Sequence, residues 1–389
     1  MDNRPLDYLI IGPAHPFRGG IAETQHELAH ALLSLGKNVT LLTFTTLYPK
    51  GLFPGKTQIS TQPEPQSLNR IEELHAFNPL KWGKTVKTIL RLQPKVVVFR
   101  YYTPFLAPVY GTIAKKIPKS IKKIALVDNW IPHEPRFFDT LFNRYFGAQI
   151  DAFSTLSETV GNQIEKTFRV PLWKGFHPMA TTLLPPLSKE EARKQLGWDN
   201  SKKVVLFFGL IRKYKGLELL VQAFADPALK SEDVHLHIAG ECYENENKYT
   251  DLVHSLGLDQ KIHFDFNYQD KKSIQLLFSG ADVVAQTYHS ATQSGVTPLA
   301  YYYQKPLLVS DVAGLKNPIV QDESGVCVAK IPSEIAKHLV RLVQADTAAF
   351  HQKKIVEALP HYSWDAFATA WDHLFLRYNF SAFSTSVFQ

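Results

Sequence analysis

The residues that could carry chemistry lie in four loops, each of which follows a short apolar run. The first loop, 12–20, places Gly19 and Gly20 directly before a segment of helical period. Paired glycines let the backbone approach a ligand closely, and the free N–H groups at a helix start attract an anion. The spacing is not Gly-x-Gly-x-x-Gly, so it gives little support to a nicotinamide dinucleotide site. We predict a phosphate-binding loop here, with a simple tight turn as the alternative.

The second loop follows the most apolar run of the chain, 204–211. Gly209 ends the strand predicted within this run, and the cations Arg212 and Lys215 come before the next helical segment. Fixed cations at the carboxyl end of a buried strand can stabilise the negative charge that grows on a departing diphosphate. We therefore predict that Arg212 and Lys215 bind phosphate, although a charge run of this kind also occurs on solvated surfaces.

The third loop carries acid–base groups. Asp128, His133 and Glu134 offer a hydrogen-bonding carboxylate, a group that titrates near neutrality and an acidic neighbour within one short segment. Two prolines, Pro132 and Pro135, restrict the turn. We predict that these three residues are catalytic, whereas the alternative for the histidine is a surface or capping role.

The fourth loop, 288–300, joins a predicted strand to a predicted helix. Small hydroxyl residues at a helix start can cap the helix and can also hold a phosphate. Pro298 in the first helical turn fits either role. The predicted donor-binding residues of this loop are Thr292, Gln293, Ser294, Gly295, Val296 and Thr297.

Two α/β domains are needed to position these loops. Short apolar runs alternate with segments of helical period, which indicates parallel sheets covered by helices on both faces. In the first domain we expect strands at 6–11, 38–43, 96–100, 124–128 and 152–156, and a long loop at 50–70. A helix at 23–35 should bury Leu28, Leu32 and Leu35 on one face and end at Gly36.

A stiff segment at 181–186 contains two prolines and separates the two halves. After it we expect strands at 204–209, 235–239, 262–264, 283–286 and 307–310. Helices are predicted at 217–224, 248–256, 271–278, 297–303 and 334–344. An amphipathic helix at 364–378 needs a partner face. The predicted domains are thus 1–183 and 184–363, with 364–389 as a helix and tail that pack back on the first domain.

Composition limits the classes of protein to consider. The chain has 389 residues, of which 45% are hydrophobic and 20% charged, as in folded two-domain proteins. The net charge of +7 favours an anionic partner, but no nucleic-acid-binding motif accompanies it. Two cysteines are too few for a disulfide framework or a zinc cluster, and no run of about 18 apolar residues could span a bilayer. We expect a cytoplasmic protein.

Taken together, the motifs resemble a GT-B glycosyltransferase of family four, the group 1 type. The resemblance rests on the Gly19–Gly20 loop, Asp128 to Glu134, Gly209 to Gly216, the Ile-Ala-Gly-Glu that ends at Glu241, and Gly295 to Pro306. It implies two Rossmann-like, doubly wound domains that face each other across a cleft, with a C-terminal helix that crosses back. The second domain would hold the nucleotide through Gly209, Arg212, Lys215 and Glu241, and the first would hold a saccharide or lipid-linked acceptor.

The resemblance also implies a retaining reaction without a cofactor or metal, and no Asp-x-Asp triplet is present. The family commonly has two glutamates separated by seven residues, and these positions fall on Thr292 and Ala300. Their loss leaves a catalytically degenerate binding subunit and a nucleotide-sugar epimerase as alternatives. Eight lysines of the first domain would suit contact with an anionic membrane, with solvated helix faces as the alternative: Lys81, Lys84, Lys87, Lys115, Lys116, Lys119, Lys122 and Lys123.

Overall fold

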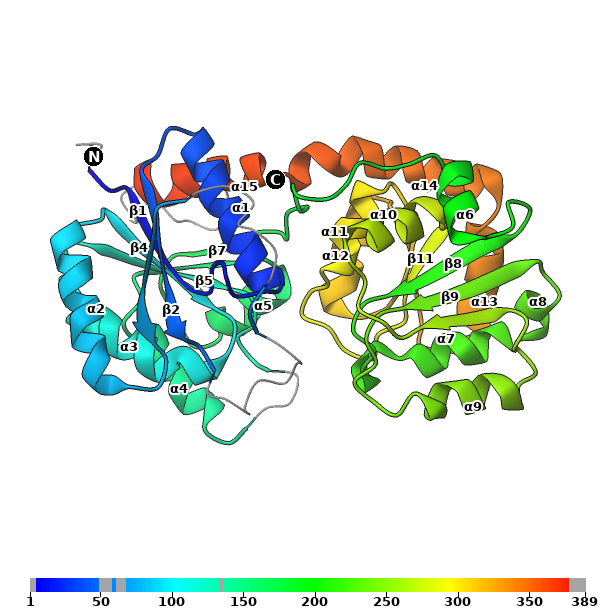
Figure 1. The fold of residues 1–389 in the computed structure, drawn as a ribbon, viewed down its shortest axis with the longest axis horizontal. Coiled ribbons are helices and arrows are strands. Elements are labelled where there is room, and N and C mark those ends of the chain that lie inside the picture. Colours follow the sequence, from blue (N-terminus) through cyan, green and yellow to red (C-terminus); the bar gives the residue numbers. More distant parts are fainter. Residues whose placement is uncertain (1–4, 49–57, 61–67, 133–135, 378–389) are drawn as a thin grey trace. The chain divides into compact units, whose positions relative to one another are not determined.

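A computed structural model describes residues 5–48, 58–60, 68–132 and 136–377. The chain forms two compact units (Figure 1). The first unit runs to Pro178 and takes up the chain again from Ser363, and the second comprises Met179–Tyr362. The chain thus passes from the first unit to the second after Pro178, before the predicted boundary at residue 183, and returns to the first unit at Ser363.

Within the described residues, the first unit contains a parallel sheet of seven strands in the order β3-β2-β1-β4-β5-β6-β7. The strands are β1 (Tyr8–Ile11), β2 (Val39–Thr46), β3 (Arg70–His75), β4 (Val96–Tyr101), β5 (Lys122–Val127), β6 (Ala152–Thr155) and β7 (Leu172–Lys174). The central strands are almost continuously apolar because helices cover both faces of the sheet.

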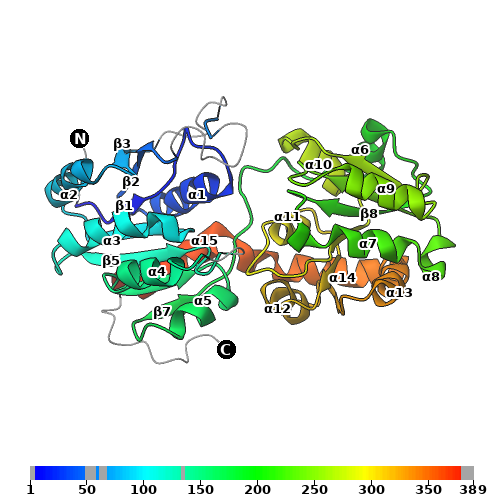
Figure 2. The same cartoon turned by 90° about the horizontal axis from the view of Figure 1, so that it is seen from below.

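The helices of the first unit form two layers (Figure 2). They are α1 (Gly20–Ser34), α2 (Pro79–Leu92), α3 (Ala107–Lys116), α4 (Asp139–Gly147), α5 (Glu158–Glu165) and α15 (Trp364–Asp372). Helices α2, α3, α4 and α5 pack on one face of the sheet, and α1 packs with α15 on the other. The C-terminal helix therefore completes the core of the first unit, through Trp364, Phe367 and Trp371.

The second unit repeats this design. Its six described strands are parallel, in the order β10-β9-β8-β11-β12-β13. They are β8 (Lys203–Phe208), β9 (Val234–Ala239), β10 (Ile262–Asp265), β11 (Val283–Gln286), β12 (Leu307–Ser310) and β13 (Gly325–Val328). The helices are α6 (Lys189–Leu196), α7 (Leu217–Phe224), α8 (Pro227–Lys230), α9 (Asn247–Ser255), α10 (Lys271–Gly280), α11 (Val296–Tyr302), α12 (Ala313–Gln321), α13 (Pro332–Leu342) and α14 (Ala345–Ala358). Both sheets are doubly wound, so ligands are expected at the carboxyl ends of their strands.

The predicted fold class is confirmed, but several details of the prediction are wrong. The first helix begins at Gly20 rather than at residue 23, and Leu35 follows its last turn with 39% of its surface exposed. The strands β3, β7 and β13 were not predicted. They lie at sheet edges, where one side of the strand is open and the apolar pattern is weak. Most of the predicted loop at 50–70 lies outside the described residues.

Among the helices that the structure describes, none has the length and apolar character needed to cross a membrane.

Candidate functional site

The strongest concentration of predicted site residues is at the carboxyl end of β8. Gly209 follows this strand with a φ of 101°, a conformation that L side chains rarely adopt. A Cβ at Gly209 would lie 2.7 Å from Nζ of Lys215 and 3.6 Å from a methyl group of Val296. The backbone conformation therefore favours glycine at position 209, and a Cβ there would displace the Lys215 ammonium group.

Lys215 is a buried cation. It ends the short 3-10 helix Lys213–Lys215, and its Nζ lies 5.1 Å from the centre of the Tyr288 ring. Burial lowers the pKa of Lys215 to about 8, because the surrounding protein solvates the charged form less well than water does. No carboxylate is paired with Lys215 among the described residues, so its charge is available to an anionic ligand.

Arg212 occupies the same loop as a more accessible cation. Its guanidinium group lies 4.8 Å from the centre of the Tyr243 ring, which restricts the side chain. The backbone next to Arg212 is hydrogen-bonded to the loop after β9, because the Ile211 N–H donates to the carbonyl of Glu241 at 2.8 Å. Glu241 itself is half-buried and follows β9. Arg212 and Glu241 thus lie on adjoining loops at one edge of the sheet.

The loop after β11 completes this group. The hydroxyl groups of Tyr288 and Ser294 lie 3.4 Å apart, and Ser294 Oγ accepts the N–H of Val296 at 3.2 Å. Gly295 is exposed and precedes α11, with no side-chain cap. Because Tyr288 contacts both Lys215 and Ser294, the structure brings together the second and fourth predicted loops.

The remaining predicted residues of this loop are buried to different extents. Thr297 Oγ1 accepts from Gln286 Nε2 at 3.0 Å, Gln293 is half-buried, and Thr292 is buried. Gly314 at the start of α12 packs so closely on this loop that a Cβ there would lie 2.3 Å from the Ala291 carbonyl oxygen. Ala300 is fully buried in α11. Thr292 and Ala300 stand where the resemblance places two glutamates, and neither is acidic.

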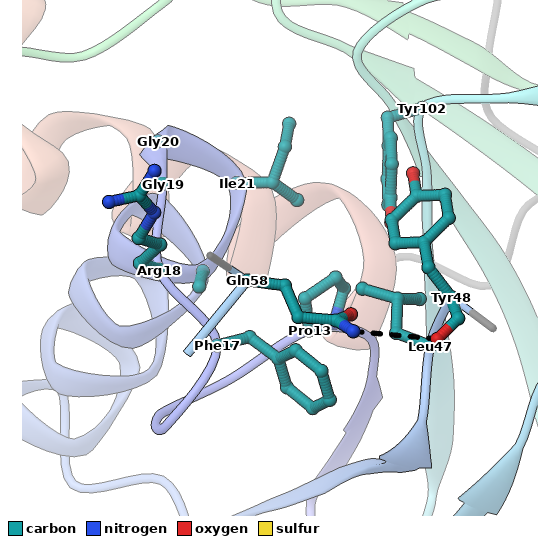
Figure 3. Close-up of a pocket in the computed structure, with 11 residues that line it drawn as sticks. Pro13, Phe17, Arg18, Gly19, Gly20, Ile21, Leu47, Tyr48, Gln58 and Tyr102 are labelled. Carbon is teal, nitrogen blue, oxygen red and sulfur yellow. Dashed lines mark hydrogen bonds between the residues drawn. The ribbon is translucent and has the colours of Figure 1, made fainter. Parts of the chain in front are cut away.

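In the first unit, Gly19 and Gly20 form one wall of a pocket of about 160 Å³ (Figure 3). Gly19 has a φ of 110° and precedes α1, where no side chain of the described residues caps the first N–H groups. Tyr48 and Tyr102 form the opposite wall. This pocket joins backbone donors that suit an anion to aromatic surfaces on which an apolar or sugar ring can pack.

Asp128 lies at the end of β5 and is buried in an ion pair. Its two carboxylate oxygens accept from Nε and Nη2 of Arg100, each at 2.6 Å. Arg100 Nη2 also donates to Thr24 Oγ1 at 2.9 Å, and this hydroxyl donates to the Gly20 carbonyl at 2.7 Å. Two predicted loops of the first unit are therefore connected through one chain of hydrogen bonds. In this arrangement Asp128 positions other groups, and its catalytic role stays a prediction.

The other two predicted catalytic residues, His133 and Glu134, lie outside the described residues. Sequence reasoning missed Arg100, Thr24, Tyr243 and the structural importance of Tyr288. For Arg100 a signal was present, since it is a charged residue inside the apolar run 96–101. No group of three or more His, Cys, Asp or Glu side chains suited to a metal ion occurs in the described part of the chain. Metal independence stays a prediction.

Comparison with known protein families identifies the type of domain that forms most of the second unit. The family model of glycosyl transferases group 1 matches residues 188–357. This region is a group 1 glycosyl transferase domain. The residues around Gly209, Lys215 and Ser294 all belong to the glycosyl transferase domain, which confirms the resemblance inferred from the sequence.

Two curated relatives each match less than half of this chain. A D-inositol 3-phosphate glycosyltransferase of Corynebacterium aurimucosum is 24% identical over 193 residues, 48% of this chain and 46% of the relative. Spore coat protein SA of Bacillus subtilis is 29% identical over 169 residues, 40% of this chain and 42% of the relative. The matched region thus spans about half the length of these relatives.

Solved structures extend the likeness to both units. Sucrose-phosphate synthase from Thermosynechococcus elongatus has a TM-score of 0.71 at 17% identity, covering 95% of this chain and 98% of that one. HepE of Anabaena, solved in complex with UDP, has a TM-score of 0.69 at 15% identity, covering 94% and 98%. At this identity the likeness concerns the fold, and that fold is GT-B, with two Rossmann-like units.

Proposed function

We propose that the protein is a glycosyltransferase that moves a sugar from a nucleoside-diphosphate donor to a saccharide or lipid-linked acceptor. Support comes from the group 1 glycosyl transferase domain and from a fold shared with HepE, which has been solved with UDP and with UDP-glucose. UDP is therefore the first nucleotide to test.

The observation that carries the proposal is the environment of Lys215. A buried cation without a carboxylate partner is costly to a folded protein, and such a cost is commonly tolerated where an anion binds. Lys215 lies against Gly209 and near Tyr288, beside the loop that contains Ser294 and Gly295. The donor diphosphate would bind here, with Arg212 as the second cation.

In the proposed reaction, the bond between the anomeric carbon and the diphosphate oxygen breaks, and the electron pair leaves with the nucleoside diphosphate. A hydroxyl oxygen of the acceptor forms the new bond to the anomeric carbon, and its proton passes to a base, the role proposed for His133 or Glu134. Lys215 and Arg212 would stabilise the charge that develops on the leaving diphosphate, which is the part of the reaction where fixed cations contribute most.

Residues of the first unit would act on the acceptor side. Gly19 and Gly20 would offer backbone N–H groups to a phosphate or a sugar, while His133 and Glu134 would be the acid–base groups. The chain from Asp128 through Arg100 and Thr24 to the Gly20 carbonyl would hold the glycine loop in position. We further propose retention of anomeric configuration, no metal requirement, and work in cell-surface glycan biosynthesis at the cytoplasmic face of a membrane.

Titration calorimetry with UDP, GDP and ADP tests the donor site, using Lys215→Met and the matched control Lys213→Met. Lys213 lies in the same short helix but its side chain is exposed. Loss of a charge-assisted hydrogen bond to phosphate costs about 1.5–3 kcal/mol, so Lys215→Met should weaken binding roughly tenfold to a hundredfold. Lys213→Met should bind as the wild type does. Equal binding by all three proteins would contradict this site.

A second candidate is a binding subunit without activity, favoured by the replacement of both family glutamates by Thr292 and Ala300. Such a subunit would bind UDP through Lys215 but would release no UDP from UDP-sugars with any saccharide or lipid-linked acceptor. A nucleotide-sugar epimerase would instead convert the donor without needing an acceptor. Measurement of UDP release with and without acceptor, together with identification of the sugar that remains on UDP, separates these three functions.

A further inference from the structure

The solvent side of α4 is unusually apolar for an exposed helix. Leu141 is 68% exposed and Tyr145 lies one turn further along, whereas Asn143 and Phe146 face the core. Phe137, just before the helix, is 97% exposed. A helix on the surface of a globular domain normally presents polar side chains to water. Large apolar groups gathered on its outer side indicate a contact surface.

Positive charge surrounds these apolar residues. Arg136 and Arg144 are exposed on the same segment, and the one acidic residue of α4, Asp139, is buried and accepts the N–H of Arg136 at 2.7 Å. The adjacent helix α3 ends in two exposed lysines and contains no acidic residue. Helices α3 and α4 lie side by side (Figure 2). The Tyr145 hydroxyl group of α4 lies 2.9 Å from Thr112 Oγ1 of α3.

A pocket of about 180 Å³ lies beside this surface, between α4 and α5. Arg144, Lys166, Thr140 and Thr167 contribute two cations and two hydroxyl groups to its lining. Neither Arg144 nor Lys166 forms an ion pair with any carboxylate in the described ranges of the chain. Ile131 lines the pocket as well and is 47% exposed. The pocket thus combines an apolar edge with cations that are available to a phosphate group.

We propose that the α4 surface, defined as Phe137, Leu141, Arg144, Tyr145 and the pocket with Lys166, binds a bilayer that contains anionic phospholipid. Phe137 and Leu141 enter the boundary between headgroups and acyl chains, and Arg144 and Lys166 contact lipid phosphates. Apolar side chains surrounded by cations are the pattern by which peripheral helices bind anionic membranes. This assignment rests on the proposed function and extends it, because an enzyme bound to the bilayer lies next to a lipid-linked acceptor.

A lipid surface fits these observations better than a protein partner. A protein contact of comparable strength would need acidic groups placed opposite each cation, whereas a bilayer offers phosphates at every position. The charge on this side of the unit is also extended, since α2 adds three exposed lysines and Arg91 with no acidic residue. A planar anionic surface can contact all of these helices together.

Sedimentation with vesicles tests the proposal. Wild-type protein is mixed with vesicles of phosphatidylcholine alone, or of phosphatidylcholine with phosphatidylglycerol. We expect binding to the mixed vesicles only, weakened by salt. The double variant Arg144→Gln with Lys166→Gln should bind about thirtyfold more weakly, since each cation near the surface contributes about tenfold or less. Phe137→Ser with Leu141→Ser should also reduce binding.

Matched controls come from the second unit. Lys194→Gln with Lys353→Gln removes two exposed cations, and Phe350→Ser with Val356→Ser removes two exposed apolar groups. Both control proteins should bind vesicles as the wild type does. All the substituted side chains of these controls and of the Phe137 and Leu141 variant are exposed, so folding should be retained, and thermal unfolding checks this.

Three results would overturn the proposal. They are absence of wild-type binding to anionic vesicles, equal binding to neutral vesicles, and full binding by the α4 variants. Dimerisation that Phe137→Ser with Leu141→Ser abolishes, without vesicle binding, would assign the surface to contact between copies of the chain. UDP affinity is measured on every variant. A variant that loses vesicle binding but keeps its UDP affinity shows that the two sites are separate. An error in the proposed donor site would change the UDP measurements and leave vesicle binding unaffected.

Discussion

Arg100 and Asp128 form a bidentate ion pair in which both N–O distances are 2.6 Å and both side chains are buried. They lie at the ends of the neighbouring strands β4 and β5, whose parallel register brings Tyr101 beside Val127. The pair extends through Thr24 to the carbonyl of Gly20. It therefore connects the strand ends to the start of α1, where the pocket lined by Gly19 and Gly20 lies.

Breaking this pair should destabilise the first unit strongly. Asp128→Ala would leave the Arg100 guanidinium buried without its counter-charge, which typically costs about 3–5 kcal/mol. Replacing both residues, as in Arg100→Met with Asp128→Leu, should cost less because no charge remains buried. Urea unfolding measures both changes. A loss of stability in the double variant as large as that in Asp128→Ala would show that the uncompensated charge is not the cause.

Gly209→Ala should disturb the donor site beyond its effect on stability. The new Cβ would lie 2.7 Å from Lys215 Nζ, and the positive φ would strain the backbone. Gly197→Ala is the matched control, because Gly197 has a φ of 68° and no atom within 4 Å of a Cβ. Each substitution should cost about 1 kcal/mol or somewhat more from backbone strain.

Only Gly209→Ala should weaken UDP binding, because only its Cβ displaces the ammonium group. Calorimetric titration of both variants with UDP gives the comparison. Unchanged affinity in Gly209→Ala would mean that Lys215 either moves without consequence or does not contact the ligand.

The low pKa of Lys215 predicts how UDP binding depends on pH. Burial sets this pKa at about 8, and diphosphate binding selects the protonated form. Affinity should therefore be constant below pH 8 and fall by up to tenfold per pH unit above it. Lys215→Met should bind weakly at every pH and lose this dependence. Titrations between pH 7 and 9 test this, and a flat profile for the wild type would contradict the assignment.

The same group predicts the pH dependence of stability without ligand. The pKa of a lysine in the unfolded chain is near 10.5, above the value of about 8 in the folded protein. The unfolded state therefore binds more protons between pH 8 and 10.5, and the contribution of Lys215 to the free energy of unfolding becomes more favourable as pH rises through this window. Comparison with Lys215→Met isolates this contribution.

The sequence predicts the central elements of both sheets well for a simple physical reason. Strands such as β4, β5 and β8 are covered on both faces, so they are continuously apolar and easily recognised. The edge strands β3 and β13 are partly exposed, and their mixed pattern gives no clear signal. The boundaries of the two units depend on contacts between distant segments and could not be read locally.

The site was predictable in its loops but not in its contacts. Gly209, Arg212 and Lys215 were identified because cations follow a glycine at a strand end. That Lys215 is buried near Tyr288 depends on the pairing of β8 with β11, two strands far apart in the chain. The partner of Asp128 could not be predicted for a related reason, because Arg100 belongs to the neighbouring strand.

The return of the chain to the first unit through α15 gives a last prediction. Phe367 is fully buried, and its ring centre lies 4.7 Å from that of Trp173 and 5.9 Å from that of Trp371. Phe367→Ala would leave a cavity in the core layer shared with α1, at a cost of about 3–5 kcal/mol. Unfolding should show this loss in the first unit, while UDP binding by the second unit persists. Phe350→Ala, at an exposed position of α14, is the control. Equal stability of the two variants would mean that α15 is not part of the folded core.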